Sequence, residues 1–103
     1  MSDKITIDVR IFASLRAVLG VKSFPMQIKS GTNIRQFLSI IEEEFETGKD
    51  FVKEIMDPDP PDRVKDYVKF VINGKILFSD DILDTKIDSE GAVIAIFPPI
   101  GGG

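Results

Sequence analysis

The sequence predicts an α+β fold in which one main helix packs on one face of a mixed sheet of four to five strands. Three patterns carry this prediction. Residues 4–12 alternate between apolar and polar side chains, residues 34–45 repeat apolar side chains at helical spacing, and Asn73-Gly74 separates two short apolar runs. Strands before and after a single long helix favour a sheet with that helix on one face.

Two strands joined by a short helical segment are expected at the start of the chain. Residues 4–12 form the first strand, and one face of it is entirely β-branched: Ile5, Ile7, Val9 and Ile11. Residues 13–19 are typical of one or two helical turns that end at Gly20, a permissive C-cap. Residues 22–29 form the second strand. Pro25 places this strand at an edge of the sheet, because proline has no N–H to donate to a central ladder.

The main helix is expected to begin after Thr32, which can cap it, and to end at Gly48. Its buried side carries an apolar stripe: Ile34, Phe37, Leu38, Ile41 and Phe45. Residues 47–66 then form an excursion from the fold, with a short apolar turn before a proline-rich stretch. The prolines favour a stiff solvated turn over a metal-binding loop.

A hairpin and a final strand complete the predicted sheet. Residues 67–73 form a strand whose inward side chains are Val68, Phe70 and Ile72. Asn73-Gly74 predicts a type I′ turn, because both residues tolerate positive φ, and residues 75–78 form the return strand. Residues 79–87 make a polar crossover from which three residues can reach the core: Ile82, Leu83 and Ile87.

After a turn at Glu90-Gly91, residues 92–97 are almost continuously apolar, which predicts a central strand covered on both faces. This order of elements resembles the β-grasp arrangement of ubiquitin. The resemblance implies that the first and last strands lie side by side and parallel at the centre of the sheet.

The composition excludes several classes of function. The chain has 103 residues, of which 43% are apolar and 29% charged, as expected of one globular domain. It contains no cysteine and no histidine, which excludes thiolate nucleophiles, histidine-based proton transfer and Cys/His metal sites. The net charge of −4 argues against nucleic-acid binding. No apolar run reaches the roughly 20 residues that cross a membrane, and the lack of a signal peptide favours the cytoplasm.

The C-terminal segment, residues 98–103, has the composition of an extended arm. Pro98 and Pro99 favour extended backbone, and the three glycines at 101–103 can enter a channel too narrow for any side chain. Six residues reach roughly 20 Å at about 3.3 Å each. By composition alone, a frayed terminus or a remnant of cloning is an equally good interpretation.

Four motifs together resemble those of the MoaD/ThiS family of ubiquitin-like sulfur carriers. Residues 97–103 match its Phe-Pro-Pro-x-x-Gly-Gly ending, and residues 12–16 match the Phe-Ala-x-Leu-Arg signature of its MoaD branch. Residues 71–74 are similar to the hairpin of that family, and residues 89–91 to one of its turns. The MoaD branch contains the small subunit of molybdopterin synthase. The segment at 47–66 is longer than in the shorter family members.

The resemblance implies a non-catalytic sulfur carrier with no permanently bound cofactor and no metal. A ubiquitin-activating-type enzyme would use ATP to adenylate the carboxylate of Gly103, and a persulfide would convert the adenylate to a thiocarboxylate. Pro98, Pro99, Gly101 and Gly102 would form the arm that delivers it. In the MoaD branch the sulfur goes to molybdopterin in the large synthase subunit, which supplies the acid and base groups.

Binding of these partners is expected to need more than the arm. Four side chains fall on or near strand faces opposite the helix and could form an exposed apolar patch: Phe12, Val71, Phe78 and Phe97. The alternative is that they pack under the excursion at 47–66. Arg10 and Arg16 could pair with acidic partner groups, or make ordinary surface salt bridges.

Three other functions remain open at this stage. The first is an archaeal-type protein modifier, joined to lysines of target proteins through the same terminal glycine. The second is a thiamin-type carrier, which is usually shorter and lacks the Phe-Ala-x-Leu-Arg signature. The third is a plain interaction domain whose glycine tail is inert.

Overall fold

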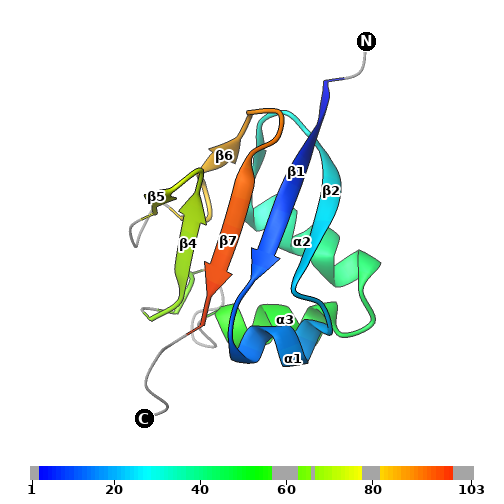
Figure 1. Cartoon of the computed structure of the whole chain (residues 1–103), viewed down its shortest axis with the longest axis vertical. Coiled ribbons are helices and arrows are strands. Elements are labelled where there is room, and N and C mark those ends of the chain that lie inside the picture. The colour runs from blue at the N-terminus through cyan, green and yellow to red at the C-terminus, as the bar shows by residue number, and fades with distance from the viewer. Residues whose placement is uncertain (1–2, 57–62, 66, 78–81, 99–103) are drawn as a thin grey trace.

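The computed structural model describes residues 3–56, 63–65, 67–77 and 82–98 (Figure 1). Five strands form one mixed sheet in the order β2-β1-β7-β4-β5, and β3 and β6 form a second, two-stranded sheet. The elements in chain order are β1 (Lys4–Ile11), α1 (Ser14–Leu19), β2 (Ser23–Lys29), β3 (Thr32–Asn33), α2 (Ile34–Glu44), α3 (Gly48–Ile55), β4 (Lys69–Ile72), β5 (Lys75–Ile76), β6 (Lys86–Ile87) and β7 (Val93–Phe97). None of the described helices is long and apolar enough to cross a bilayer.

The centre of the sheet is the parallel pair of β1 and β7, as the resemblance implied. Asp8 lies beside Val93, and Ile11 lies beside Ile96. β2 runs antiparallel to β1 at the edge of the sheet, with Pro25 opposite Asp8. The edge position predicted from Pro25 is therefore confirmed.

One hydrophobic core lies between the sheet and the helices. The alternating face of β1 is buried as predicted, and β7 adds Ile94 and Ile96, which have no exposed surface. The predicted stripe of α2 is buried except for Phe45, which is half-buried and contacts the ring of Phe24. Ile82, Leu83 and Ile87 also reach the core, as expected of the crossover.

The start and the end of α2 both differ from the prediction. Asn33, not Thr32, is the N-cap: its side chain accepts the N–H of Gln36 at 2.8 Å, and the Gln36 side chain accepts the N–H of Asn33 at 3.0 Å. The Thr32 hydroxyl instead donates to the carbonyl of Lys29. The helix ends at Glu44, four residues before Gly48.

We expect Asn33→Ala to lower the free energy of unfolding by about 1 kcal/mol, because it removes the side-chain oxygen that accepts the N–H of Gln36 and leaves only the backbone half of the capping box. For a domain of this size the melting temperature should fall by about 4–8 °C. Thermal denaturation measures the change. Ser39→Ala, an exposed substitution within α2, is the matched control. An equal loss of stability in both variants would contradict a specific role of the cap.

The excursion predicted at 47–66 begins with a helix rather than a short apolar turn. Phe51 and Ile55 lie four residues apart on one side of α3 and are fully buried. Gly48 does not end α2 but begins α3. A Cβ at Gly48 would overlap the backbone carbonyl of Ile41, so only glycine allows the two helices to approach this closely. The proline-rich stretch at 57–62 lies outside the described residues.

The turn at Asn73-Gly74 has the predicted positive φ values, 50° and 85°. The backbone N–H of Asn73 donates to the carbonyl of Val93, and its side-chain oxygen accepts the N–H of Val93, both at 2.9 Å. The hairpin is therefore tied to β7. The return strand is shorter than expected, because β5 comprises only Lys75–Ile76.

Candidate functional site

The face of the sheet opposite the core carries most of the residues predicted to bind partners. Side chains alternate along a strand, so burial of Ile7 and Val9 sends Asp8 and Arg10 to this outer face. The strand register then aligns one outward row across four strands: Arg10, Ala95, Val71 and Ile76. A second row contains Phe97 opposite Lys69.

An apolar surface results, which we call the outer-face patch: Phe12, Val71, Ile76, Val93 and Phe97. Ile76 has 51% of its surface exposed, and the other four side chains are half-buried. The last strand is central as predicted, but its outer side is covered only in part: Ala95 is buried, whereas Val93 and Phe97 are half-buried. β7 is apolar on its outer side because that side contributes to this patch.

Ile76 was not included among the residues of the expected apolar patch. Its place was recoverable, because a two-residue turn at Asn73-Gly74 pairs Val71 with Ile76 and puts both on one face. Tyr67, which has 74% of its surface exposed just before β4, was also overlooked. No periodic pattern pointed to it.

Phe12 and Phe97 meet at the point where the C-terminal segment leaves the sheet. Their ring centroids are 4.3 Å apart and the rings are 11° from parallel. The N–H of Phe12 donates to the carbonyl of Ile96, which extends the contact between β1 and β7 by one residue. The guanidinium carbon of Arg16 lies 5.3 Å from the centroid of the Phe12 ring. We call these three side chains, Arg16, Phe12 and Phe97, the root stack.

The structure places Pro98 directly after the root stack, and Pro98 is buried. β1 and β7 both finish at the end of the sheet where α1 and α3 lie (Figure 1). Of the remaining predicted site residues, Phe78, Pro99, Gly101, Gly102 and Gly103 lie outside the described residues.

The two arginines have different surroundings. Arg10 forms an ion pair with Asp8 at 3.0 Å, and both side chains are largely exposed. Arg16 donates from its Nε to the carbonyl of Ile11 at 2.7 Å and covers Phe12. Arg10 therefore makes the ordinary surface salt bridge of the prediction, whereas Arg16 belongs to the root stack.

The alternative prediction was that the patch residues pack under the excursion at 47–66. The position of α3, the helical part of that segment, does not support it. This helix packs against α1 and α2, and its Phe51 and Ile55 enter the main core. The helical part of the excursion thus lies away from the outer-face patch.

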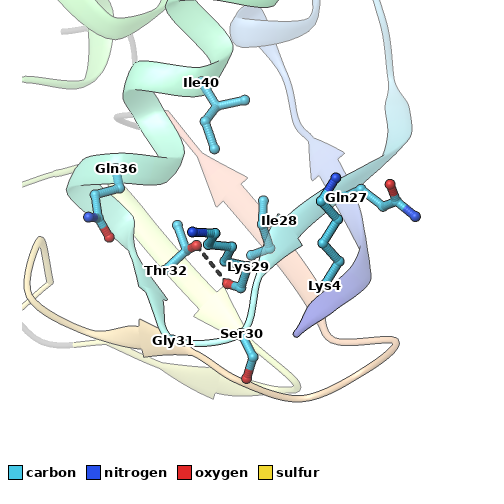
Figure 2. A pocket seen from close by; sticks show the side chains of 9 residues that line it. All are labelled: Lys4, Gln27, Ile28, Lys29, Ser30, Gly31, Thr32, Gln36 and Ile40. Carbon is cyan, nitrogen blue, oxygen red and sulfur yellow. Dashed lines mark hydrogen bonds between the residues drawn. The ribbon is translucent and has the colours of Figure 1, made fainter. Parts of the chain in front are cut away.

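A recess of about 450 Å³ lies at the opposite end of the molecule, where β1 begins (Figure 2). Figure 2 shows Lys4 and Gln27 on one side of it and Thr32 and Gln36 on the other. Its nine lining residues include no carboxylate, so it offers no acid–base pair. Within the described ranges, His, Cys, Asp and Glu side chains form no group that could hold a metal ion.

The chain is similar to known proteins over nearly its whole length. The profile of the ThiS family matches residues 9–103. The small archaeal modifier protein 3 of Haloferax volcanii is 27% identical over 97 residues, which are 94% of this chain and 98% of that protein.

Solved structures share the fold. The solution structure of the Haloferax volcanii HVO 2177 protein has a TM-score of 0.75 at 25% identity, covering 98% of this chain and 89% of that one. A putative molybdopterin converting factor, subunit 1, from Pyrococcus furiosus has a TM-score of 0.66 at 22% identity, over 93% and 99% of the two chains. The latter likeness is one of fold alone. The predicted β-grasp, ubiquitin-like fold is confirmed.

Proposed function

The chain belongs to the ThiS family, and from that premise we propose that it is a sulfur carrier whose C-terminal carboxylate, on Gly103, becomes a thiocarboxylate. The acceptor of the sulfur is a molybdopterin precursor held by the large subunit of molybdopterin synthase. The Phe-Ala-x-Leu-Arg motif at residues 12–16 supports this acceptor over the thiamin-type pathway. Acid and base groups belong to that partner.

The proposed chemistry begins with activation, because a carboxylate is a poor electrophile. A carboxylate oxygen of Gly103 attacks the α-phosphorus of ATP in an activating enzyme and releases pyrophosphate. The terminal sulfur of a persulfide on a partner protein then attacks the acyl carbon, and AMP leaves. A partner thiol breaks the resulting acyl disulfide. The products are the thiocarboxylate on this chain and a disulfide on the partner.

The observation that carries the proposal is the position of the root stack. It shares Phe12 and Phe97 with the outer-face patch and lies immediately before the C-terminal segment. An activating enzyme that covers this apolar surface would receive the C-terminal segment in the same encounter.

A second candidate function is protein modification, in which the adenylated or thioester-linked Gly103 is transferred to a lysine amine of a target protein. The similarity to a Haloferax volcanii protein named as a modifier favours it. Both functions share the first step, and they differ in the group that accepts the acyl or sulfur product.

Intact-mass spectrometry tests the proposal. The chain is incubated with a candidate activating enzyme, ATP and a persulfide donor, with a reaction lacking ATP as control. We expect an ATP-dependent mass increase equal to the replacement of one oxygen by sulfur. Isopeptide-linked products in place of that increase would favour the modifier. No change at all, with an enzyme shown to activate another carrier, would contradict both.

A further inference from the structure

We propose that Arg16 is a positioning residue for activation of the C-terminus, acting through Phe12 on Phe97. The inference rests on the proposed function and adds to it a residue that never touches the reacting carboxylate. Two contacts hold Arg16 within the described residues: its Nε donates to the Ile11 carbonyl, and its guanidinium lies over Phe12.

The backbone between Phe12 and Arg16 is shaped to make this contact. Ala13 has a φ of 52°, a conformation that costs energy for any residue with a Cβ. This reversal starts α1 directly after Phe12, with the N–H of Arg16 donating to the carbonyl of Ala13 at 3.0 Å. The chain thereby turns back so that Arg16 lies over the Phe12 ring. An outlier held by its surroundings is a reasonable sign of function.

Phe12 passes this restraint to the last strand. Its ring stacks on Phe97 at 4.3 Å, and its N–H holds the carbonyl of Ile96. Phe97 is half-buried, so solvent and a side-chain rotation could otherwise loosen it. The planar guanidinium suits this role, because it can stack on an aromatic ring while donating a directed hydrogen bond.

Restraint of Phe97 affects the direction in which the C-terminal segment leaves the sheet. Gly103 lies six residues beyond Phe97, so the orientation of Phe97 sets the direction from which the chain continues toward the carboxylate. Reaction in the activating enzyme requires near-contact geometry, and displacements of about 1 Å can cost about 100-fold in rate. Restraint at Phe97 thus raises the fraction of encounters that place the carboxylate correctly.

The test measures pyrophosphate release by an activating enzyme with the full chain as substrate. We expect Arg16→Gln to lower kcat about tenfold and to change KM less than about twofold, because the binding surface is intact. Arg10→Gln is the matched control: it removes the same charge, and the ion pair that it breaks is the one with Asp8. It should change neither constant more than about twofold.

Arg16→Lys separates positioning from direct contact with an acidic partner group. Lysine keeps the charge but lacks the planar guanidinium with its Nε–H. Positioning predicts that Arg16→Lys is nearly as slow as Arg16→Gln. Full activity of Arg16→Lys, or a raised KM with unchanged kcat in Arg16→Gln, would overturn the inference in favour of a direct contact.

NMR relaxation supplies a readout that does not depend on the enzyme. The order parameter of the Phe97 amide should fall in Arg16→Gln and stay unchanged in Arg10→Gln. An unchanged value in Arg16→Gln overturns the inference. Absence of pyrophosphate release with the wild-type chain overturns the proposed function and this inference together, whereas normal turnover of Arg16→Gln overturns the inference alone.

Discussion

Deletion of Gly103 should reduce formation of the thiocarboxylate by more than about 100-fold, the largest effect that we predict. The shortened chain still ends in a glycine pair with a free carboxylate. Its carboxyl carbon, however, falls short by one residue, or about 3.3–3.6 Å of extended chain. That distance exceeds the misplacement of about 1 Å that already costs about 100-fold in an oriented reaction. Intact-mass spectrometry with the activating enzyme and a persulfide donor measures the loss.

The control for this deletion restores the number of residues after Phe97 but leaves the chain with two terminal glycines instead of three. One glycine placed between Pro99 and Ile100 of the shortened chain returns the Gly-Gly carboxylate to its original reach, and it should recover much of the activity. The described core residues all lie between Ile5 and Ile96, so we expect equal melting temperatures. Full activity of the shortened chain would show that reach is not limiting.

Phe97→Ala should raise the Kd for the activating enzyme by about 30-fold or more. The reason is that an aromatic anchor at the centre of a docking surface typically contributes at least about 2 kcal/mol. The same change should lower the free energy of unfolding by only about 1 kcal/mol, because the half-buried ring loses its stacking on Phe12 and little else. Isothermal titration calorimetry and thermal denaturation measure the two effects.

Phe70→Ala is the matched control for Phe97→Ala. Phe70 lies on β4 beside Ile96 of β7, but its side chain faces the core and is fully buried. Its truncation should cost about 3–5 kcal/mol of stability, while the fraction that remains folded binds the enzyme normally. If Phe97→Ala instead lowered the melting temperature as much as Phe70→Ala and left binding unchanged, Phe97 would be a core residue.

Short sequence patterns predicted much of the fold, because the burial of a strand face, an edge strand and a tight turn each depend on a few neighbouring residues. Alternation in β1 identified the buried face, Pro25 identified an edge strand, and Asn73-Gly74 identified the turn. The errors came where two local signals competed. Thr32 and Asn33 can both cap a helix, and in the structure Asn33 makes the capping box with Gln36 whereas the Thr32 hydroxyl bonds to Lys29. Gly48 is a plausible helix end, yet contact between α2 and α3 requires glycine there for lack of space.

By itself the sequence determined the buried face of β1 and the composition of the C-terminal segment, because these depend on residue type and spacing. The motif at residues 12–16 also pointed to the family from the sequence alone. Only the tertiary structure decided that Phe12 stacks on Phe97 and that Arg16 covers Phe12. Such contacts depend on strand register and on the backbone reversal at Ala13, which bring together residues that no sequence period relates.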